Sequence, residues 1–382
     1  MNNPFESIRK IFTPSQPLSP GVYHYQAPPD APFPYRLHLR IEGGGQGVLI
    51  VNASTVLHLN QTAAEYAYHL MQGDSDAGVA RRIAARYNVD TSTARRDYLD
   101  FVERLNTLID MPDLDPVTYL DFERQSPYTD ITAPYRLDCA LTYRLPDGND
   151  PQAAPTKRVD RELTTVEWQT ILDKAWEAGI PHIIFTGGEP TLRDDLFSLL
   201  RHVEETGQVT GLLSDGLRLA DNDYFQELLQ TGLDHLMIVL RPEMEQAWVA
   251  LENVLPADLY TTVHLTITPE NRAQAGALLE RLKSMGANAV SLSASDLSLE
   301  MELMQARQLA ADLELELVWD IPVPYSELNP VSLETDEDTL PKGSGRAWLY
   351  VEPDGDVLPA QGVNQVLGNL LQDPWIKIWE GK

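Results

Sequence analysis

The chain has 382 residues, of which 43% are hydrophobic and 23% charged, a composition typical of globular proteins with two or three domains. The net charge of −28 is uneven: residues 1–112 hold 10 basic and 11 acidic residues, and the remainder holds 19 and 46. This acidic remainder opposes binding to nucleic acid or to an anionic membrane through that part of the chain. No apolar run approaches the ~20 residues of a membrane-spanning helix, and the start lacks a signal-peptide pattern, so we expect a cytoplasmic protein.

The first part of the chain predicts an arm and a small domain. Residues 1–34 are rich in proline and lack periodicity. The alternation in residues 36–41 and the β-rich run at 47–51 predict a hairpin. Helical patterns follow at residues 62–71, 77–87 and 92–108. We therefore expect an N-terminal arm over 1–34, a small winged-helix-like α+β domain over 35–112 and a linker over 113–131.

From Tyr135 onwards, strand and helix patterns alternate regularly. Apolar, β-rich runs predict strands at residues 137–143, 181–186, 209–213, 235–240, 261–268, 288–293 and 314–319. Helical patterns separate successive strands, and the first of them begins at a capping box formed by Thr164 and Glu167. Six strand–helix units and a seventh strand predict an α/β fold with a parallel sheet, either open or curved into a partial barrel.

The segment from Phe185 to Arg193 joins the second strand to its helix and predicts a ligand site. Gly187 and Gly188 lack a Cβ and let the backbone approach a ligand closely. Glu189 follows at the carboxyl end of the strand, where the ligand sites of parallel sheets lie. Mostly small or polar residues follow the other strands: Arg144, Leu145, Ser214, Asp215, Gly216, Arg241, Thr268, Asn271, Ser293, Ser295 and Asp320. We expect a shared pocket, and the alternative is a Glu189 carboxylate that only caps a helix.

The last part of the chain predicts a hairpin and a helix. Asp354 and Gly355 lie between the apolar runs 347–351 and 357–358, which is a strong hairpin signal. Trp375, Ile378 and Trp379 belong to a final helical pattern, and we expect them to pack on the sheet.

Three segments resemble known families. The run Phe185–Leu192 resembles the glycine-glycine-glutamate motif of radical S-adenosylmethionine (SAM) enzymes, which implies a partial (βα)6 TIM-type barrel over residues 132–325. The tail over 326–382 looks like a degenerate form of the SPASM or twitch extension of those enzymes. Residues 36–110, especially the run from Val56 to Ala64, resemble the PqqD-like domain, also called the RiPP recognition element, which implies a precursor-peptide leader as partner.

The same resemblance implies a SAM pocket. Its residues here would be Gly187, Gly188, Glu189, Ser214 and Asp215. Arg241 would place a cation at the mouth of this pocket, for an anionic ligand or for a salt bridge to Glu189.

The cluster ligands of that family are absent. Radical SAM enzymes hold a [4Fe-4S] cluster with three cysteines in a C-x3-C-x2-C spacing after the first strand. Alignment on Leu141 to Arg144 places Leu145, Asn149 and Gln152 at those positions, and none of them replaces a thiolate well. The single cysteine, Cys139, falls inside the strand, where we expect a buried core residue. The histidines show no ligand spacing, so we expect no cluster and no other metal site.

We therefore expect a cluster-less pseudoenzyme that binds a peptide or partner protein in peptide natural-product (RiPP) maturation, together with an active radical SAM partner enzyme or without one. A peptide can add to the edge of the predicted hairpin beside the helix at 92–108. The alternative is that Arg36, His38 and Arg40 blunt this edge.

Two other functions stay open. One is an enzyme that uses the SAM pocket for non-radical chemistry, with Glu189 orienting the SAM amine. The other is a winged-helix regulator whose arginines contact nucleic acid phosphates, namely Arg81, Arg82, Arg86, Arg95 and Arg96. The acidic remainder of the chain weighs against the regulator.

Overall fold

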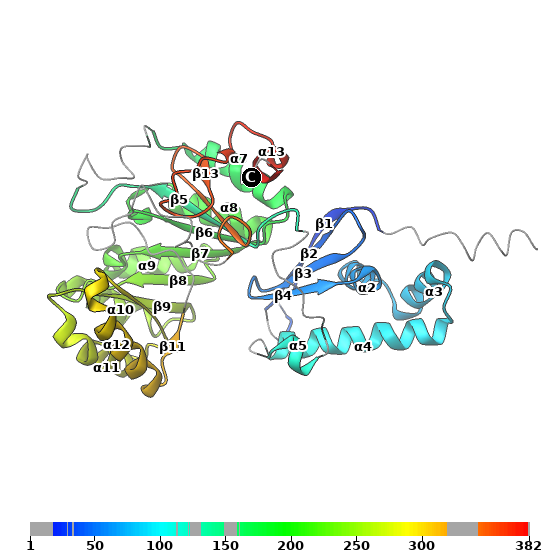
Figure 1. The fold of residues 1–382 in the computed structure, drawn as a ribbon, viewed down its shortest axis with the longest axis horizontal. Helices are drawn as coiled ribbons and strands as arrows, with labels where there is room; N and C mark the ends of the chain where they lie inside the picture. The colour runs from blue at the N-terminus through cyan, green and yellow to red at the C-terminus, as the bar shows by residue number, and fades with distance from the viewer. Residues whose placement is uncertain are drawn as a thin grey trace, which may run out of the picture. The chain divides into compact units, whose positions relative to one another are not determined.

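The computed structural model describes residues 18–28, 30–32, 34–111, 114–120, 122, 131–148, 159, 161–318 and 343–380. The chain divides into two compact units, Met1–Thr132 and Ala133–Lys382, which are mainly blue to cyan and mainly green to red in Figure 1. Within the described ranges, no helix combines the length and the hydropathy that crossing a membrane requires.

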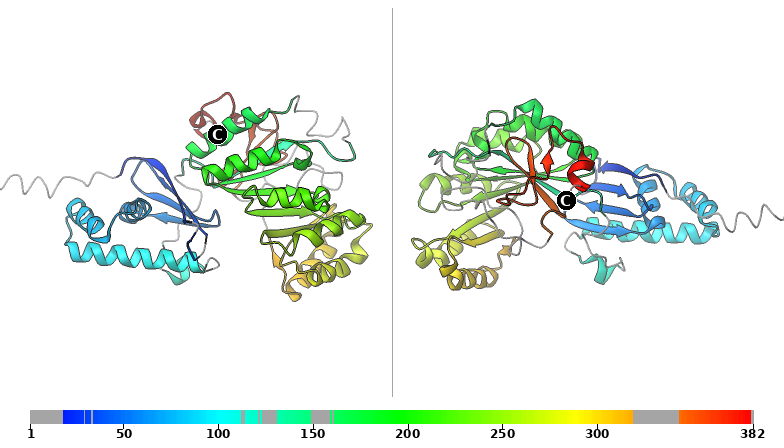
Figure 2. Two further views of the ribbon diagram at one scale, coloured as in Figure 1. Left: turned by 180° about the vertical axis from the view of Figure 1, so that it is seen from behind. Right: turned by 45° about the horizontal axis from the view of Figure 1, so that its top comes forward.

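The first unit combines an antiparallel sheet with a set of helices (Figures 1 and 2). Its strands, in spatial order, are β1 (Gly21–Gln26), β2 (Arg36–Ile41), β3 (Gly47–Val51) and β4 (Thr55–Leu59). Its helices are α2 (Gln61–Met71), α3 (Asp76–Tyr87), α4 (Thr91–Asp110) and α5 (Pro116–Tyr119). The core packs Leu39, Leu49 and Leu57 of the sheet together with Ile83 of α3 and Leu105 of α4.

Two of these strands, β1 and β4, are missing from the sequence prediction. β1 lies within the segment 1–34, and all its residues are half-buried or exposed, so its sequence has no clear apolar face. β4 has 5 residues and precedes α2 by a single residue, so its apolar residues merge with the helical pattern.

The alternative in which Arg36, His38 and Arg40 blunt a sheet edge is wrong. These residues belong to β2, which is flanked by β1 and β3. Within the residues that the structure describes, the edge strands of this sheet are β1 and β4. A long charged or polar side chain on an inner strand cannot protect either edge.

The second unit confirms the predicted α/β fold class with a parallel sheet. Its parallel strands are β5 (Arg136–Thr142), β6 (His182–Gly187), β7 (Val209–Ser214), β8 (His235–Val239), β9 (Tyr260–Ile267), β10 (Ala289–Ala294) and β11 (Glu316–Leu317). The helices that alternate with them are α7 (Thr165–Glu177), α8 (Leu196–Thr206), α9 (Asn222–Leu229), α10 (Glu245–Val254), α11 (Ala275–Ser284) and α12 (Glu300–Asp312). These are the six βα units of a partial TIM-type barrel, and each of the seven predicted strands overlaps an observed one.

The tail extends the sheet beyond β5. Strand β12 (Trp348–Val351) pairs parallel with β5, and β13 (Asp356–Leu358) and β14 (Gly368–Asn369) follow in antiparallel register. In the final helix α13 (Trp375–Glu380), Ile378 and Trp379 are buried, as the pattern predicts. The Lys174 ammonium of α7 donates to the Leu370 carbonyl at 2.6 Å, which joins the tail to the first helix of the barrel.

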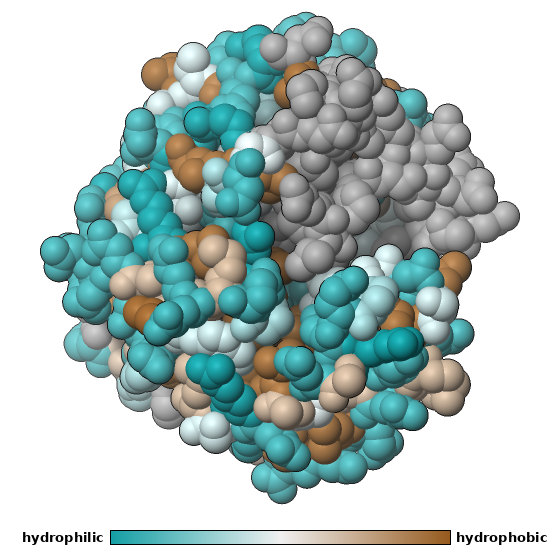
Figure 3. Space-filling model, turned by 90° about the vertical axis from the view of Figure 1, so that its left-hand side faces the viewer, coloured by the Kyte–Doolittle hydropathy of each residue, from teal (hydrophilic) through white to brown (hydrophobic). Residues whose placement is uncertain are grey.

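One face of the molecule shows how hydrophilic and hydrophobic residues are distributed on the surface. Figure 3 shows a face that is mostly hydrophilic, with small, separate hydrophobic areas. Such a distribution is ordinary for a folded protein, because scattered apolar residues remain exposed on most surfaces.

A histidine pair packs closely across three neighbouring strands. The Nε2 atoms of His182 on β6 and His235 on β8 lie 2.7 Å apart. Gly211, on the intervening strand β7, leaves the space that the His235 ring occupies, because a Cβ at this position would lie 2.2 Å from Cε1 of that ring. The hydrogen bond to His182 holds the ring in this place.

We expect Gly211→Ala to lower the free energy of unfolding by about 1–3 kcal/mol, because overpacking against a fixed ring forces strand or side-chain shifts. Urea unfolding of the full chain measures this change. The matched control is Gly276→Ala in α11, where the nearest neighbour of the new Cβ is the flexible end of Leu309 at 3.3 Å; the control should be neutral or slightly stabilising. Unchanged stability of Gly211→Ala would contradict the packing described here.

Candidate functional site

The Glu189 carboxylate lies at the centre of the predicted site and joins the turn after β6 to the end of β7. Its Oε1 accepts hydrogen bonds from the Thr191 N–H and the Ser214 hydroxyl, both at 2.9 Å. Its Oε2 accepts the Asp215 N–H at 2.7 Å. Only 2% of Glu189 is exposed, so the carboxylate is buried and hydrogen-bonded by its own chain. The bond from Thr191 also caps the short 3-10 helix η1 (Pro190–Leu192), which is the capping function considered as the alternative.

The two glycines of the motif are required by contacts inside the protein. The Gly188 N–H donates to the Thr142 carbonyl at 2.7 Å, and the Glu189 N–H donates to the Arg144 carbonyl at 2.9 Å. Gly187 has a φ of 122°, and a Cβ there would lie 2.1 Å from the Thr142 oxygen. A Cβ on Gly188 would lie 2.4 Å from the Arg144 oxygen. The glycines therefore let the turn lie directly against the end of β5.

Arg193, the last residue of the motif, fixes the turn from the other side. Its Nη1 donates to the Leu141 carbonyl at 3.1 Å and its Nη2 to the Leu163 carbonyl at 3.0 Å. The guanidinium also pairs with Asp195, with Nη2 2.7 Å from Oδ2. Sequence reasoning missed this residue, because its carbonyl partners lie 30 and 52 positions earlier in the chain and leave no local pattern.

Asp215, whose N–H donates to Glu189, interacts electrostatically with Arg241. Burial raises the pKa of both carboxyl groups, and the Asp215 charge raises that of Glu189 further. Arg241 opposes the rise in the pKa of Asp215. In the described part of the chain, the ion pairs of Arg241 are with Asp147, at 2.9 Å, and with Glu243, at 3.5 Å, so the salt bridge considered between Arg241 and Glu189 does not form.

The strand ends further along the sheet form a separate polar group. The Nε2 of His264 lies 2.9 Å from the Ser293 hydroxyl, and the Asn271 side chain closes a turn onto Thr268 and Thr266. Ser295 bonds through its N–H to the Ile267 carbonyl. None of the hydrogen bonds recorded for the described residues joins this group to Glu189. Asp320, also expected in the pocket, lies outside the described residues.

The residues at the expected cluster positions do not fit an iron–sulfur cluster. Cys139 lies within β5 and is wholly buried, and burial together with the adjacent Asp138 carboxylate raises the pKa of its thiol well above the usual value. A neutral thiol is a poor iron ligand. Leu145 is half-buried against an apolar cluster of Ala140, Tyr143, Tyr350 and Leu358. Asn149 and Gln152 lie outside the described residues.

A buried hydrogen-bonded group lies beside this position. The Tyr143 hydroxyl donates to Oε1 of Glu352 at 2.9 Å and lies 3.2 Å from the Tyr350 hydroxyl. Both tyrosines and Glu352 are at most 5% exposed. The end of β5, from which a cluster-binding loop would start, is therefore packed with aromatic rings and joined to the tail. In the ranges that the structure describes, no group of three or more His, Cys, Asp or Glu side chains could hold a metal ion.

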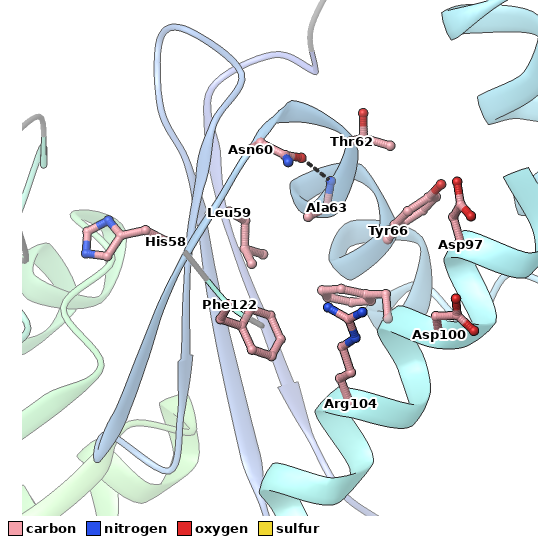
Figure 4. Close-up of a pocket in the computed structure, with 11 residues that line it drawn as sticks. His58, Leu59, Asn60, Thr62, Ala63, Tyr66, Asp97, Asp100, Arg104 and Phe122 are labelled. Carbon is pink, nitrogen blue, oxygen red and sulfur yellow. Dashed lines mark hydrogen bonds between the residues drawn. The ribbon is translucent and has the colours of Figure 1, made fainter. Parts of the chain in front are cut away.

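The first unit contains a cavity of about 480 Å³ between β4, α2 and α4. Leu59 of β4, Tyr66 of α2 and Phe101 of α4 contribute apolar wall. Phe122 also lines the cavity, and Figure 4 shows its ring between Leu59 and Arg104. The remaining lining residues are His58, Asn60, Thr62, Ala63, Asp97 and Asp100. The cavity thus lies between the edge strand β4 and the helix at which the sequence predicts a peptide.

The chain is similar to known proteins in both units. Residues 139–241 match the Radical SAM superfamily, and residues 47–108 match Coenzyme PQQ synthesis protein D (PqqD). It is 30% identical over 281 residues to a PqqA peptide cyclase of Streptomyces rochei, in an alignment that covers 65% of this chain and 76% of that protein. A PqqA peptide cyclase of Granulibacter bethesdensis is 25% identical over 282 residues, 65% of this chain and 73% of that protein.

Two solved structures of Streptococcus suis SuiB share the fold. SuiB bound to the precursor peptide SuiA has a TM-score of 0.57 at 14% identity, over 89% of this chain and 86% of that one. SuiB bound to S-adenosylmethionine has a TM-score of 0.56 at 15% identity, over 94% and 88%. At these identities, the similarity establishes the shared fold. It does not establish which ligands this chain binds.

We expect Glu189→Gln to lower the free energy of unfolding by about 1–3 kcal/mol at pH 5. The amide nitrogen cannot accept the hydrogen bond from the Asp215 N–H and turns an N–H toward it, whereas a protonated carboxyl keeps an acceptor on each oxygen. The penalty should shrink toward pH 8. A carboxyl with a raised pKa holds its proton in the folded state above the unfolded value of about 4.3, so wild-type stability falls as the pH rises through the folded pKa. Urea unfolding at both pH values measures this; a constant difference between wild type and variant would contradict it.

Proposed function

This chain belongs to the radical SAM superfamily and carries a PqqD domain, and from that premise we propose that it is a cluster-less pseudoenzyme that binds a precursor peptide. The family relation implies a SAM pocket and, in most members, a [4Fe-4S] cluster. The peptide relation rests on the PqqD match at residues 47–108 and on the relatives, which are named as peptide cyclases. The peptide would be held for modification by a partner, of which an intact radical SAM enzyme is the simplest kind.

The proposal rests on the residues at the end of β5, which lack thiolate ligands for a cluster. Radical cleavage of SAM needs an electron from a cluster held by thiolates. The chain has 1 cysteine, and it is a buried thiol inside a strand. Leu145, which takes the place of the first cluster cysteine, contributes to an apolar cluster. These residues pack against their neighbours, and they do not form a set of ligands for iron.

The peptide would add to the sheet of the first unit as a further strand. β4 is an edge strand, and an edge strand offers unpaired backbone N–H and C=O groups to an added strand. The cavity beside β4 would receive side chains of the added strand. This arrangement supports binding at β4 over binding at β1, the other edge.

A SAM-binding enzyme with non-radical chemistry is the second candidate. It is favoured by the convergence of Glu189, Ser214 and Asp215 at neighbouring strand ends. It is opposed by the hydrogen bonds of Glu189, because a carboxylate has about four acceptor positions and three are filled by the chain itself. The winged-helix regulator has less support, because Arg86 already pairs with the buried Glu65 carboxylate and Arg82 with Asp74 of the same unit.

We expect isothermal titration with SAM, up to millimolar concentration, to give no detectable heat of specific binding. The reason is that three hydrogen bonds from the chain itself already satisfy most of the buried Glu189 carboxyl, so a hydrogen bond from the SAM amine would bring little net gain. Specific binding at micromolar SAM that Glu189→Gln abolishes would instead favour the SAM-dependent enzyme. A circular dichroism spectrum of the variant controls for loss of the fold.

We expect panning of a random heptapeptide phage library against the full chain to enrich peptides that bind beside β4. Hydrogen–deuterium exchange with an enriched peptide should show slower exchange of the β4 amides, because strand addition pairs them. Strand β1, at the opposite edge of the same sheet, is the internal control and should not change. Enrichment no greater than for an unrelated protein, or protection at β1 alone, would contradict peptide binding by this route.

A further inference from the structure

The cavity of the first unit carries a specific pattern of apolar and charged groups. Its apolar part is lined by Leu59, Tyr66, Phe101 and Phe122, and the ring centroids of Tyr66 and Phe101 lie 6.0 Å apart. Tyr66 and Phe101 are each 6% exposed. These buried rings form a wall for one large apolar side chain of a ligand.

The charged groups of the cavity come from one face of α4. Asp97, Asp100 and Arg104 follow at helical spacing of three and four residues, so they line the same side of the helix, as Figure 4 shows. Arg104 is engaged by its own chain, because its Nη1 donates to the Leu120 carbonyl at 3.1 Å. His58 also lines the cavity, and burial together with the charge of Arg40 lowers its pKa, so it is neutral at pH 7.

The two carboxylates are available to a cation. Asp97 pairs with Arg96 at 3.0 Å, but the two side chains are 46% and 67% exposed, and such surface pairs contribute little. For Asp100, the described part of the chain provides neither a hydrogen bond nor an ion pair. The cavity therefore offers net negative charge next to an aromatic wall.

The spacing of these groups matches an extended peptide. Phe101 and Asp97 are four residues apart on α4, a rise of about 6 Å. In an added strand, side chains on the same face are two residues apart, at about 6.6 Å. A peptide that places a large apolar residue on the ring of Phe101 would therefore place the residue two positions away beside Asp97, and Asp100 lies between Phe101 and Asp97 along the helix.

From this geometry we propose that the cavity selects peptides with a lysine or arginine two positions from a large apolar residue. The inference rests on the proposed peptide binding and adds its specificity. The apolar residue supplies most of the affinity, because it fills the aromatic wall. The basic residue supplies the selectivity, because an acidic residue at the same place would meet two like charges.

The test uses labelled heptapeptides in which phenylalanine is the only large apolar residue and threonine fills the other positions. Lysine, glutamine or glutamate stands two positions before or two positions after the phenylalanine, which covers both directions of the added strand. Fluorescence anisotropy with the full chain measures the six dissociation constants. For one of the two directions, we expect the lysine peptide to bind about 10-fold or more tighter than its glutamate counterpart.

Variants of α4 assign the preference to the cavity. Asp97→Asn combined with Asp100→Asn should remove the difference between lysine and glutamate peptides and leave the glutamine peptide within about 2-fold of wild type. Asp100→Lys should reverse the preference. Asp110→Asn removes the same charge from the same helix outside the cavity and should change nothing.

Three outcomes would overturn the inference. Equal binding of all peptides would refute the selectivity, and peptide binding at β4 would still stand from the library experiment. A lysine preference that survives the double substitution would refute the role of Asp97 and Asp100. If no peptide of the set binds, the inference also fails, and enrichment of library peptides at β4 decides separately whether the proposed function holds.

Discussion

The structure of the candidate site depends on the contact between the backbone at the end of β5 and the turn of Gly187 and Gly188. Two hydrogen bonds of 2.7 and 2.9 Å cross this contact, and a side chain on either glycine would separate the two segments. The contact places Glu189 beneath the end of β7, where it becomes buried and accepts three hydrogen bonds. The glycine-glycine-glutamate motif locates the ligand site in its superfamily. In this chain, internal packing alone is enough to explain why these three residues are present.

The same region shows which properties can be predicted from sequence. Strand and helix alternation in the second unit follows from local apolar patterns, so all seven predicted strands are observed. The grouping of Gly187 to Glu189 with Ser214 and Asp215 follows because parallel strands end at one edge of the sheet. The bonds from Arg193 to the Leu141 and Leu163 carbonyls and the ion pair of Arg241 with Asp147 were not predictable, since these partners lie 30 to 94 positions away in the sequence.

The first unit shows which properties could not be predicted from the sequence. Strands β1 and β4 were missed because they are short or poorly buried, and their pairing is decided by neighbouring strands more than by their own residues. Without β1, the wrong strand was taken as an edge, although the expectation of a peptide beside α4 did not depend on that choice. The cavity at β4 gathers residues from three separate stretches, 58–66, 97–104 and Phe122, and no local pattern marks such a set.

Under the proposed function, the first unit binds a peptide and the second unit has lost radical chemistry. The barrel keeps the turn of its superfamily, but its first strand leads into a packed aromatic group, while the PqqD domain keeps an edge strand and a cavity. The most direct measurement is anaerobic reconstitution of the full chain with iron and sulfide, followed by iron counting and visible absorption. The account predicts no stoichiometric iron and no cluster absorption; about four iron atoms per chain would contradict it.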